Sequence, residues 1–156
     1  MAGTWPTARA ALKAQLDGVT ASVAGHEAET LDALEYAPGG RQDAQEWPYG
    51  FFLPVGEVVT REPGNQRITT KSPVFRVMLA PRGQSSDMES LHKRYDAWKE
   101  ALKDALDDAV AADGNADVFL TQEFGDLAFF EDVDVGWGFD MTFGELQLSE
   151  TKTFGP

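Results

Sequence analysis

The sequence predicts an α+β fold: a mostly antiparallel sheet of about four or more strands, a long amphipathic helix over about residues 87–112 packed on it, and a short N-terminal helix. Two observations carry this prediction. Apolar residues recur at steps of three and four through the long-helix segment, which is helical spacing. Segments with strand character gather before and after it, an order typical of antiparallel sheets. We therefore expect a single domain over residues 1–156, with a loose tail at about 151–156.

The long helix has the clearest pattern in the chain. Its apolar face consists of Met88, Leu91, Tyr95, Trp98, Leu102, Leu106 and Val110. Ser86 and Glu89 stand in the S-x-x-E order of a capping box, although Ser85 or Asp87 could cap the helix instead. Gly114 suits the end, because Gly readily takes the left-handed conformation that closes a helix. The two large aromatic residues of the apolar face predict that it lies across a sheet.

The segments before the long helix predict a helix, a strand and a loop. Residues 4–24 are expected to form a short surface helix, which Gly18 ends or bends. Residues 29–36 are a candidate strand. Residues 37–46 contain Pro-Gly-Gly and no apolar residue larger than Ala, so we expect a polar loop there.

A long hairpin is expected next. The aromatic segment 47–53 and the apolar segment Val74–Ala80 predict its strands, in which residues 49–60 pair with residues 67–80. Val74–Ala80 is apolar on both faces apart from Arg76. A strand of this kind is expected at the centre of its sheet or beneath the long helix.

Three strands are expected after the long helix. The first covers residues 117–124, Gly125-Asp126 has the composition of a two-residue hairpin turn, and residues 127–135 form the second. Residues 137–143 alternate strictly between large apolar residues and small or polar ones, as a half-buried strand does. The alternation then changes phase, which predicts a bulge or bend near Gly144-Glu145.

Composition excludes several classes of function. No apolar run approaches the length of a membrane span, and the first residues lack the features of a signal peptide, so we expect a cytoplasmic origin and no membrane contact. The absence of Cys excludes disulfides and thiolate chemistry. The sequence contains no phosphate-loop, dinucleotide-binding, serine-hydrolase or zinc-protease motif, so we expect neither catalysis nor a cofactor.

The net charge of −13 is concentrated in one part of the chain. Thirteen of the 26 acidic residues lie between Asp104 and Thr151, in a segment without Lys or Arg. An acidic field repels phosphate, so tight binding of nucleic acid is not expected. The segment is either a solvated surface that aids solubility or an acidic wall that faces DNA without gripping it, and composition does not choose between the two.

One cluster of carboxylates stands out within this acidic segment. It consists of Glu131, Asp132 and Asp134, with Asp140 close by. Carboxylates at this spacing can bind Ca²⁺ or Mg²⁺. Because Asp132 and Asp134 occupy alternate positions of an expected strand and no Gly turn wraps a cation, we predict a solvated strand face or loop and no metal site.

Basic residues gather in the predicted hairpin. Residues 61–82 contain Arg61, Arg67, Lys71, Arg76 and Arg82, with Glu62 as the only acidic residue. Two explanations stay open. The basic segment can pair with the acidic third of a neighbouring copy, in a head-to-tail contact that makes a ring if it closes. Alternatively, it packs against the acidic strands of its own chain.

The order of elements, the charge split and the length together resemble the tail terminator, or tail completion, proteins of long-tailed bacteriophages. The resemblance rests on the N-terminal helix at 7–16, the hairpin ending at Val74–Ala80, the polar break at 81–86, the helix at 88–110 and the closing strands at 117–150. Tail-tube proteins and head–tail connector proteins share parts of this layout.

The resemblance implies a structural, non-enzymatic role in the virion. A homo-oligomeric ring, a hexamer in this family, would cap the head-proximal end of the tail tube, stop its growth and join the tail to the head connector. Its partners would be further copies of itself, the tail tube protein and the connector protein, and genomic DNA would pass through without specific binding. The alternatives are another head–tail or tube component, or a monomeric acidic binding domain of a bacterial cell.

Nine residues are the candidate contacts under this interpretation. Contacts with neighbouring subunits are expected from Arg61, Arg67, Lys71 and Arg76. A partner surface is expected at Trp47 and Tyr49. The residues expected to face a lumen or a neighbour are Glu131, Asp132 and Asp134.

Overall fold

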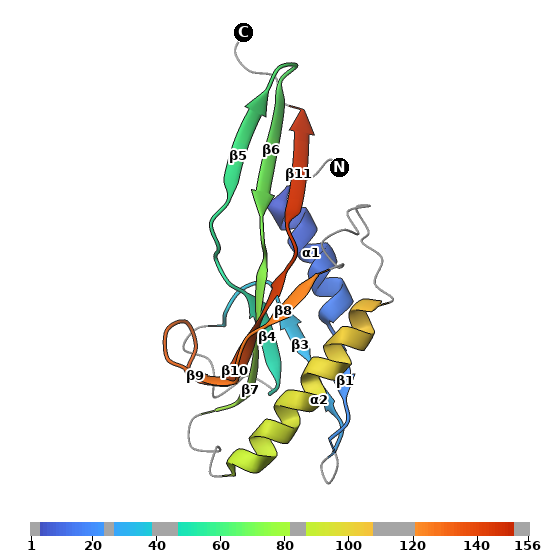
Figure 1. The fold of residues 1–156 in the computed structure, drawn as a ribbon, viewed down its shortest axis with the longest axis vertical. Helices are drawn as coiled ribbons and strands as arrows, with labels where there is room; N and C mark the ends of the chain where they lie inside the picture. The colour runs from blue at the N-terminus through green and yellow to red at the C-terminus, as the bar shows by residue number, and fades with distance from the viewer. Residues whose placement is uncertain (1–3, 24–26, 39–46, 82–86, 108–120, 152–156) are drawn as a thin grey trace.

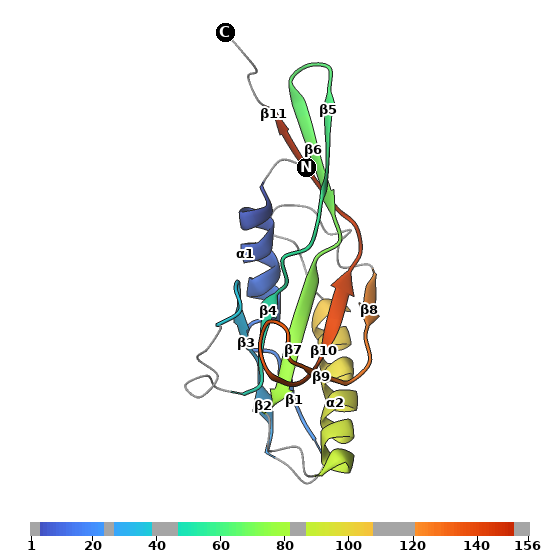
Figure 2. The ribbon, with the colours of Figure 1, turned by 90° about the vertical axis from the view of Figure 1, so that its left-hand side faces the viewer.

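A computed structural model describes residues 4–23, 27–38, 47–81, 87–107 and 121–151. It has a body, in which two helices cover one face of a six-stranded sheet, and an arm, a three-stranded sheet that extends from one end of the body (Figures 1 and 2). The α+β class is confirmed. The sheet structure is more extensive than about four strands.

The body sheet is antiparallel except at one edge. Its order is β3 (Asp32–Leu34), β4 (Tyr49–Phe52), β7 (Val74–Ala80), β10 (Gly136–Phe143) and β8 (Gln122–Phe124), and β9 (Ala128–Phe130) also pairs with β10. Only β3 and β4 run parallel. The predicted central position of Val74–Ala80 is confirmed, because β7 lies between β4 and β10.

The hairpin predicted at Gly125-Asp126 is wrong. β8 and β9 do not pair with each other; both pair antiparallel with β10, β8 opposite its second half and β9 opposite its first. The Gly125 N–H donates to the Asp140 carbonyl at 2.8 Å, so the chain keeps its direction through the break. The two segments form one interrupted edge strand, whose pairing shifts by one residue as at a bulge. The residues of the first predicted strand before 121 lie outside the described residues.

The arm contains β5 (Val58–Glu62), β6 (Gln66–Lys71) and β11 (Leu146–Thr151), in the order β11-β6-β5. Each arm strand follows or precedes a body strand in the chain. The predicted long hairpin is confirmed, with Tyr49 opposite Met78 in the body and Val58 opposite Thr70 in the arm. The predicted bend near 144–145 is also confirmed, because the chain passes there from β10 in the body to β11 in the arm.

The first helix is shorter than predicted. α1 spans Trp5–Leu16, and Gly18 follows with a φ of +81°, a left-handed conformation that favours Gly. The Gly18 N–H then donates to the Leu31 carbonyl at 3.0 Å. Residues expected to continue the helix instead form β1 (Thr20–Ala21), which pairs with β2 (Glu29–Thr30). The helix ends early because Gly18 turns the chain towards Leu31, which lies between β2 and β3.

The long helix α2 spans Met88–Asp107, in agreement with the apolar pattern. Its cap is Asp87, whose Oδ1 accepts a hydrogen bond from the Ser90 N–H at 3.2 Å. Ser86 and the predicted helix end at 108–114 lie outside the described residues. Neither helix in the described part of the chain combines the length and the apolar composition of a membrane span.

The two faces of the body sheet carry separate cores. The larger core joins α1 and α2 to one face, through Leu12, Trp98, Leu102, Val77 and Phe139 among others. The opposite face carries a smaller cluster, in which Tyr49, Phe51 and Met78 are buried beneath half-buried neighbours that include Trp47 and Phe130. The alternation of β4 and β7 therefore supplies apolar residues to both faces of the sheet. Several of the predicted site residues lie in or beside the smaller cluster, among them Trp47 and Tyr49.

Close approach of β7 and β10 requires Gly138. An added Cβ there would lie 2.1 Å from the Val77 carbonyl oxygen and 3.1 Å from the Met78 Cα. We expect Gly138→Ala to lower the free energy of unfolding by about 2–3 kcal/mol, because backbone atoms of the central strands must separate. Urea unfolding followed by circular dichroism measures the change.

The matched control is Gly56→Ala, since nothing lies within 4 Å of a Cβ at Gly56. This variant should be as stable as the wild type or slightly more stable, because Ala narrows the unfolded ensemble. Equal stability of the Gly138→Ala variant and the wild type would show that β7 and β10 are not held this close.

Candidate interaction site

The outer strand of the arm, β5, is the most accessible of the strands that the structure describes. All five of its residues are exposed, and the exposed fraction of Val58 reaches 66%. In the described structure β5 pairs only with β6, so its other edge is open. An open strand edge presents backbone N–H and C=O groups that can pair with another chain. The arm thus offers apolar side chains and backbone hydrogen-bonding groups together.

A groove of about 450 Å³ runs between this arm and the first residues of α1. Its lining combines residues of the helix, of β5 and β6, and of the end of β11: Thr4, Trp5, Pro6, Glu57, Val59, Arg61, Arg67, Thr69 and Glu150. The structure therefore places Arg61 and Arg67 at one surface, opposite each other across the β5–β6 pair. The remaining predicted cations lie elsewhere.

The two groove arginines differ in their partners. Arg67 Nη2 donates to Glu150 Oε2 of the adjacent β11 at 2.8 Å. Arg61 is exposed and forms no ion pair with any residue that the structure describes. Of the cations predicted to contact a neighbour, Arg61 is therefore the one whose charge is open to a partner.

Lys71 does not lie on an open surface, contrary to the prediction. Its side chain is only 4% exposed, and its Nζ lies 3.5 Å from Glu57 Oε1 and 4.2 Å from the centre of the Trp5 ring. The start of α1 covers this end of β6, an arrangement that the sequence pattern of the hairpin alone does not reveal.

Arg76 also lies inside its own subunit, so its predicted contact with a neighbour is wrong. Its Nε and Nη2 donate to the two carboxylate oxygens of Asp140 at 2.7 and 3.1 Å, and its Nη1 donates to Asp132 Oδ1 at 2.7 Å. The guanidinium also covers the ring of Phe130, 3.6 Å from its centre. A buried cation needs paired anions, and β10 and the loop between β9 and β10 supply them. For Arg67 and Arg76, the basic hairpin pairs with the acidic strands of its own chain.

The contacts of Arg76 shift the pKa of its own guanidinium and the pKa of Asp132. Partial burial would raise the pKa of Asp132, but hydrogen bonds from the Val133 N–H and from Arg76 outweigh it, so the pKa is lowered. Burial likewise opposes the charged form of Arg76, yet Asp140 and Asp132 raise the pKa of its guanidinium. The charged forms of both partners are therefore favoured in the folded protein.

The predicted partner surface at Tyr49 and the predicted lumen position of Asp134 are both wrong. Each side chain is fully buried, and the Tyr49 hydroxyl donates to Asp134 Oδ2 at 2.9 Å. Burial, with Asp134 adding to it, raises the pKa of the Tyr49 hydroxyl. Trp47 is half-buried and packs edge-on against Tyr49, with ring centres 4.8 Å apart.

The carboxylate cluster is divided between solvent and core. Residues 132–134 form a bend after β9 and do not continue it as a strand, which corrects the predicted strand over 127–135. Glu131 is exposed and the Asp132 side chain is 64% exposed, whereas Asp134 points inward. Among the described residues, no group of three or more His, Asp or Glu side chains has a geometry that could hold a metal ion.

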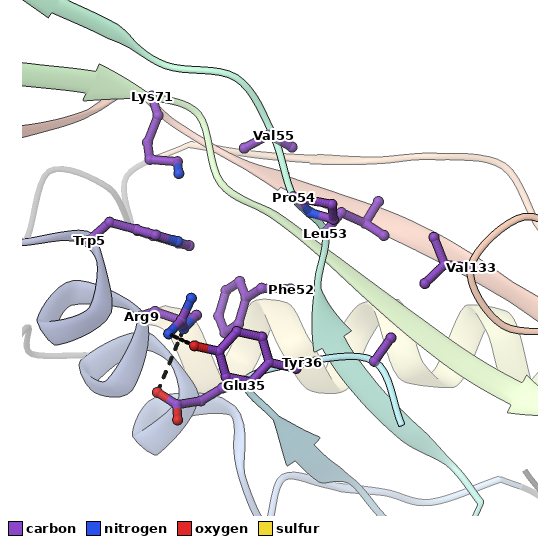
Figure 3. A pocket seen from close by; sticks show the side chains of 11 residues that line it. Trp5, Arg9, Glu35, Tyr36, Phe52, Leu53, Pro54, Val55, Lys71 and Val133 are labelled. Carbon is purple, nitrogen blue, oxygen red and sulfur yellow. Dashed lines mark hydrogen bonds and ion pairs between the residues drawn. The ribbon is translucent and has the colours of Figure 1, made fainter. Parts of the chain in front are cut away.

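A second hollow lies on the body side of Trp5. This cavity measures about 440 Å³, and its walls come from α1, from the chain around β3 and β4, and from Lys71 of β6 (Figure 3). The sequence pattern did not predict this cavity, although Trp5 and Arg9 stand four residues apart on the first helix and so share one face.

No family model matches the sequence, and no curated protein matches it at a significant level.

The buried ion pairs should contribute measurably to stability. We expect Arg76→Met to lower the free energy of unfolding at pH 7 by about 2–3 kcal/mol, because it removes three charged hydrogen bonds and leaves two carboxylates unpaired. Lys93→Met is the control, since Lys93 forms an exposed pair with Glu89 and its loss should cost less than about 0.5 kcal/mol. Equal effects of the two changes would contradict a structural role for Arg76.

The difference between wild type and Arg76→Met should depend on pH. The folded-state pKa of Asp132 is lowered, so its stabilising contribution is present above the unfolded pKa of about 4 and is lost as the pH falls through the folded value. Urea unfolding at pH 7 and at pH 3 should show the difference shrinking at the lower pH. A difference that stays constant would show that charge pairing is not its origin.

Proposed function

We propose that this protein is a structural assembly protein that forms a ring, in the manner of the tail terminators of long-tailed bacteriophages. In this proposal a ring of about six copies caps the tail tube, stops its growth and joins the tail to the head connector. The observation that supports it best is the arm, which extends away from the body and leaves β5 exposed (Figure 2).

An arm of this kind favours assembly over action as an isolated unit. Exposed apolar residues on an open strand edge, such as Val58, are a liability for a protein without partners, and a neighbouring subunit or the tube protein would cover them. Arg61 beside them has no ion pair in the described structure, so an acidic surface of a neighbouring copy can match it. A head-to-tail contact between arm and body closes into a ring when its rotation allows.

The acidic surplus fits a passage for DNA. Glu131 and Asp132 remain exposed on the body, and both are candidates for a wall that repels phosphate and lets DNA slide. The proposed role needs no catalysis and no cofactor. It places the protein in the virion, at the head-proximal end of the tail, after synthesis in the host cytoplasm. Another head–tail or tube component would use the same arm.

The second candidate is a monomeric acidic binding domain of a bacterial cell. The cavity beside Trp5 favours it, because a concave apolar cavity with a few charged groups is the usual form of a ligand site. The two candidates differ in oligomeric state. Light scattering of the purified protein, alone and with the tail tube protein of the same virion, separates them. A ring mass in either sample supports the terminator proposal, and a monomer in both supports the binding domain.

Assembly should depend on the exposed face of β5. We expect Val58→Lys to reduce ring formation at least tenfold, because it places a charge at the contact while barely affecting a monomer in which the residue is exposed. Met88→Lys is the control, since Met88 is also an exposed apolar residue but lies at the start of α2, away from the arm. Light scattering measures both variants. Normal rings from the Val58→Lys variant would remove β5 from the interface.

A further inference from the structure

The cavity beside Trp5 combines apolar walls with two buried cations. Trp5, Phe52, Leu53, Pro54 and Val55 supply most of the apolar surface, and the rings of Trp5 and Phe52 meet edge-on at 5.8 Å. Arg9 extends into it from α1 and Lys71 from β6 (Figure 3). Its volume of about 440 Å³ lies within the range of cavities that bind small organic molecules.

Arg9 is held in the cavity without full hydrogen bonding. Its side chain is 11% exposed, and its Nη2 donates to the Tyr36 hydroxyl. Its Nε, however, is buried and has no hydrogen-bond partner in the structure, because the nearest carboxylate oxygen, Glu35 Oε1, is 3.6 Å away. Buried polar groups are normally paired, so the Arg9 guanidinium, which lines the cavity, lacks one acceptor.

Lys71 is placed in a similar way on the other side of the indole (Figure 3). Its ammonium group contacts the Trp5 ring and has Glu57 as its nearest carboxylate, at 3.5 Å. The carboxylates that pair with these cations are partly exposed, Glu35 in the cavity wall and Glu57 in the neighbouring groove, whereas the two cations are buried. The interior of the cavity is therefore positive and apolar in a chain whose net charge is −13.

From this arrangement we propose that the cavity binds a carboxylate attached to a compact apolar group, such as an aryl acid. The apolar group would lie against Trp5, Phe52 and Pro54, and the carboxylate would accept hydrogen bonds from the Arg9 guanidinium and from Lys71 Nζ. A charged acceptor suits these donors because charge-assisted hydrogen bonds are stronger than neutral ones. This site does not depend on whether the protein forms rings.

The test compares 3-phenylpropionate with 3-phenylpropionamide, which has the same shape without the charge. Isothermal titration calorimetry on the full chain should show saturable one-site binding of the acid and at least tenfold weaker binding of the amide. Arg9→Met and Lys71→Met, which keep most of the side-chain stem, should each weaken binding of the acid by about tenfold. Equal affinity for acid and amide, or no saturable binding of either, would overturn the proposal.

Two further variants make the test independent of folding defects. Lys13→Met removes a cation from the same helix outside this cavity, and should leave the affinity within about twofold of wild type. Glu35→Gln removes the carboxylate that competes for Arg9, and should tighten binding of the acid. A damaged fold cannot increase affinity, so tighter binding of the acid by the Glu35→Gln variant would support the proposal. Weaker binding would count against it.

The same chemistry has two possible sources, which a peptide can distinguish. The pentapeptide Gly-Ser-Gly-Ser-Phe with a free carboxylate presents an aryl group and an acid at a chain end, and its C-terminal amide is the control. Binding of the free peptide as tight as that of 3-phenylpropionate would support a site for the end of a protein chain. Binding of 3-phenylpropionate alone would support a site for small free acids.

Discussion

The structure on the sheet face that the helices do not cover depends on the buried charge of Arg76. This cation lies on the central strand β7, on the sheet face that the helices do not cover. Burying it requires carboxylates at short range, and Asp140 directly opposite on β10 supplies two hydrogen bonds. Asp132 supplies the third and thereby draws the loop after β9 over the sheet. That loop brings Asp134 to the Tyr49 hydroxyl and closes the smaller core.

The arm forms because the strands of the long hairpin extend beyond the body sheet into a second sheet. Body strand β4 continues in the chain as arm strand β5, arm strand β6 continues as body strand β7, and β10 continues as β11. The arm is therefore positioned by the core of the body, which contains Leu146 and Leu148 at the base of β11. Further out, β5 has no such cover and its residues are exposed. A segment that is anchored at its base and bare along its edge is suited to contact another chain.

Because ion pairs form within the subunit, the uneven distribution of charge along the sequence does not by itself imply attraction between copies. Arg67 and Arg76 are matched by Glu150, Asp140 and Asp132 of the same chain, so most of the apparent attraction between basic hairpin and acidic third is satisfied internally. What remains for partners is smaller and more local: Arg61 at the groove, and the exposed carboxylate of Glu131. The cations of the cavity, Arg9 and Lys71, form a separate positive site around Trp5.

The sequence by itself determined the elements whose signal is local. Helical spacing located α2, a continuous apolar run located β7 as a central strand, and a change of phase located the passage from β10 to β11. Only the tertiary structure decided which side chains are accessible. Alternation assigns a residue to a face of a strand, but the burial of Tyr49, Lys71, Arg76 and Asp134 depends on what covers that face. The cover comes from segments distant in the chain, the loop after β9 and the start of α1, and contacts between distant segments leave no periodic trace in a sequence.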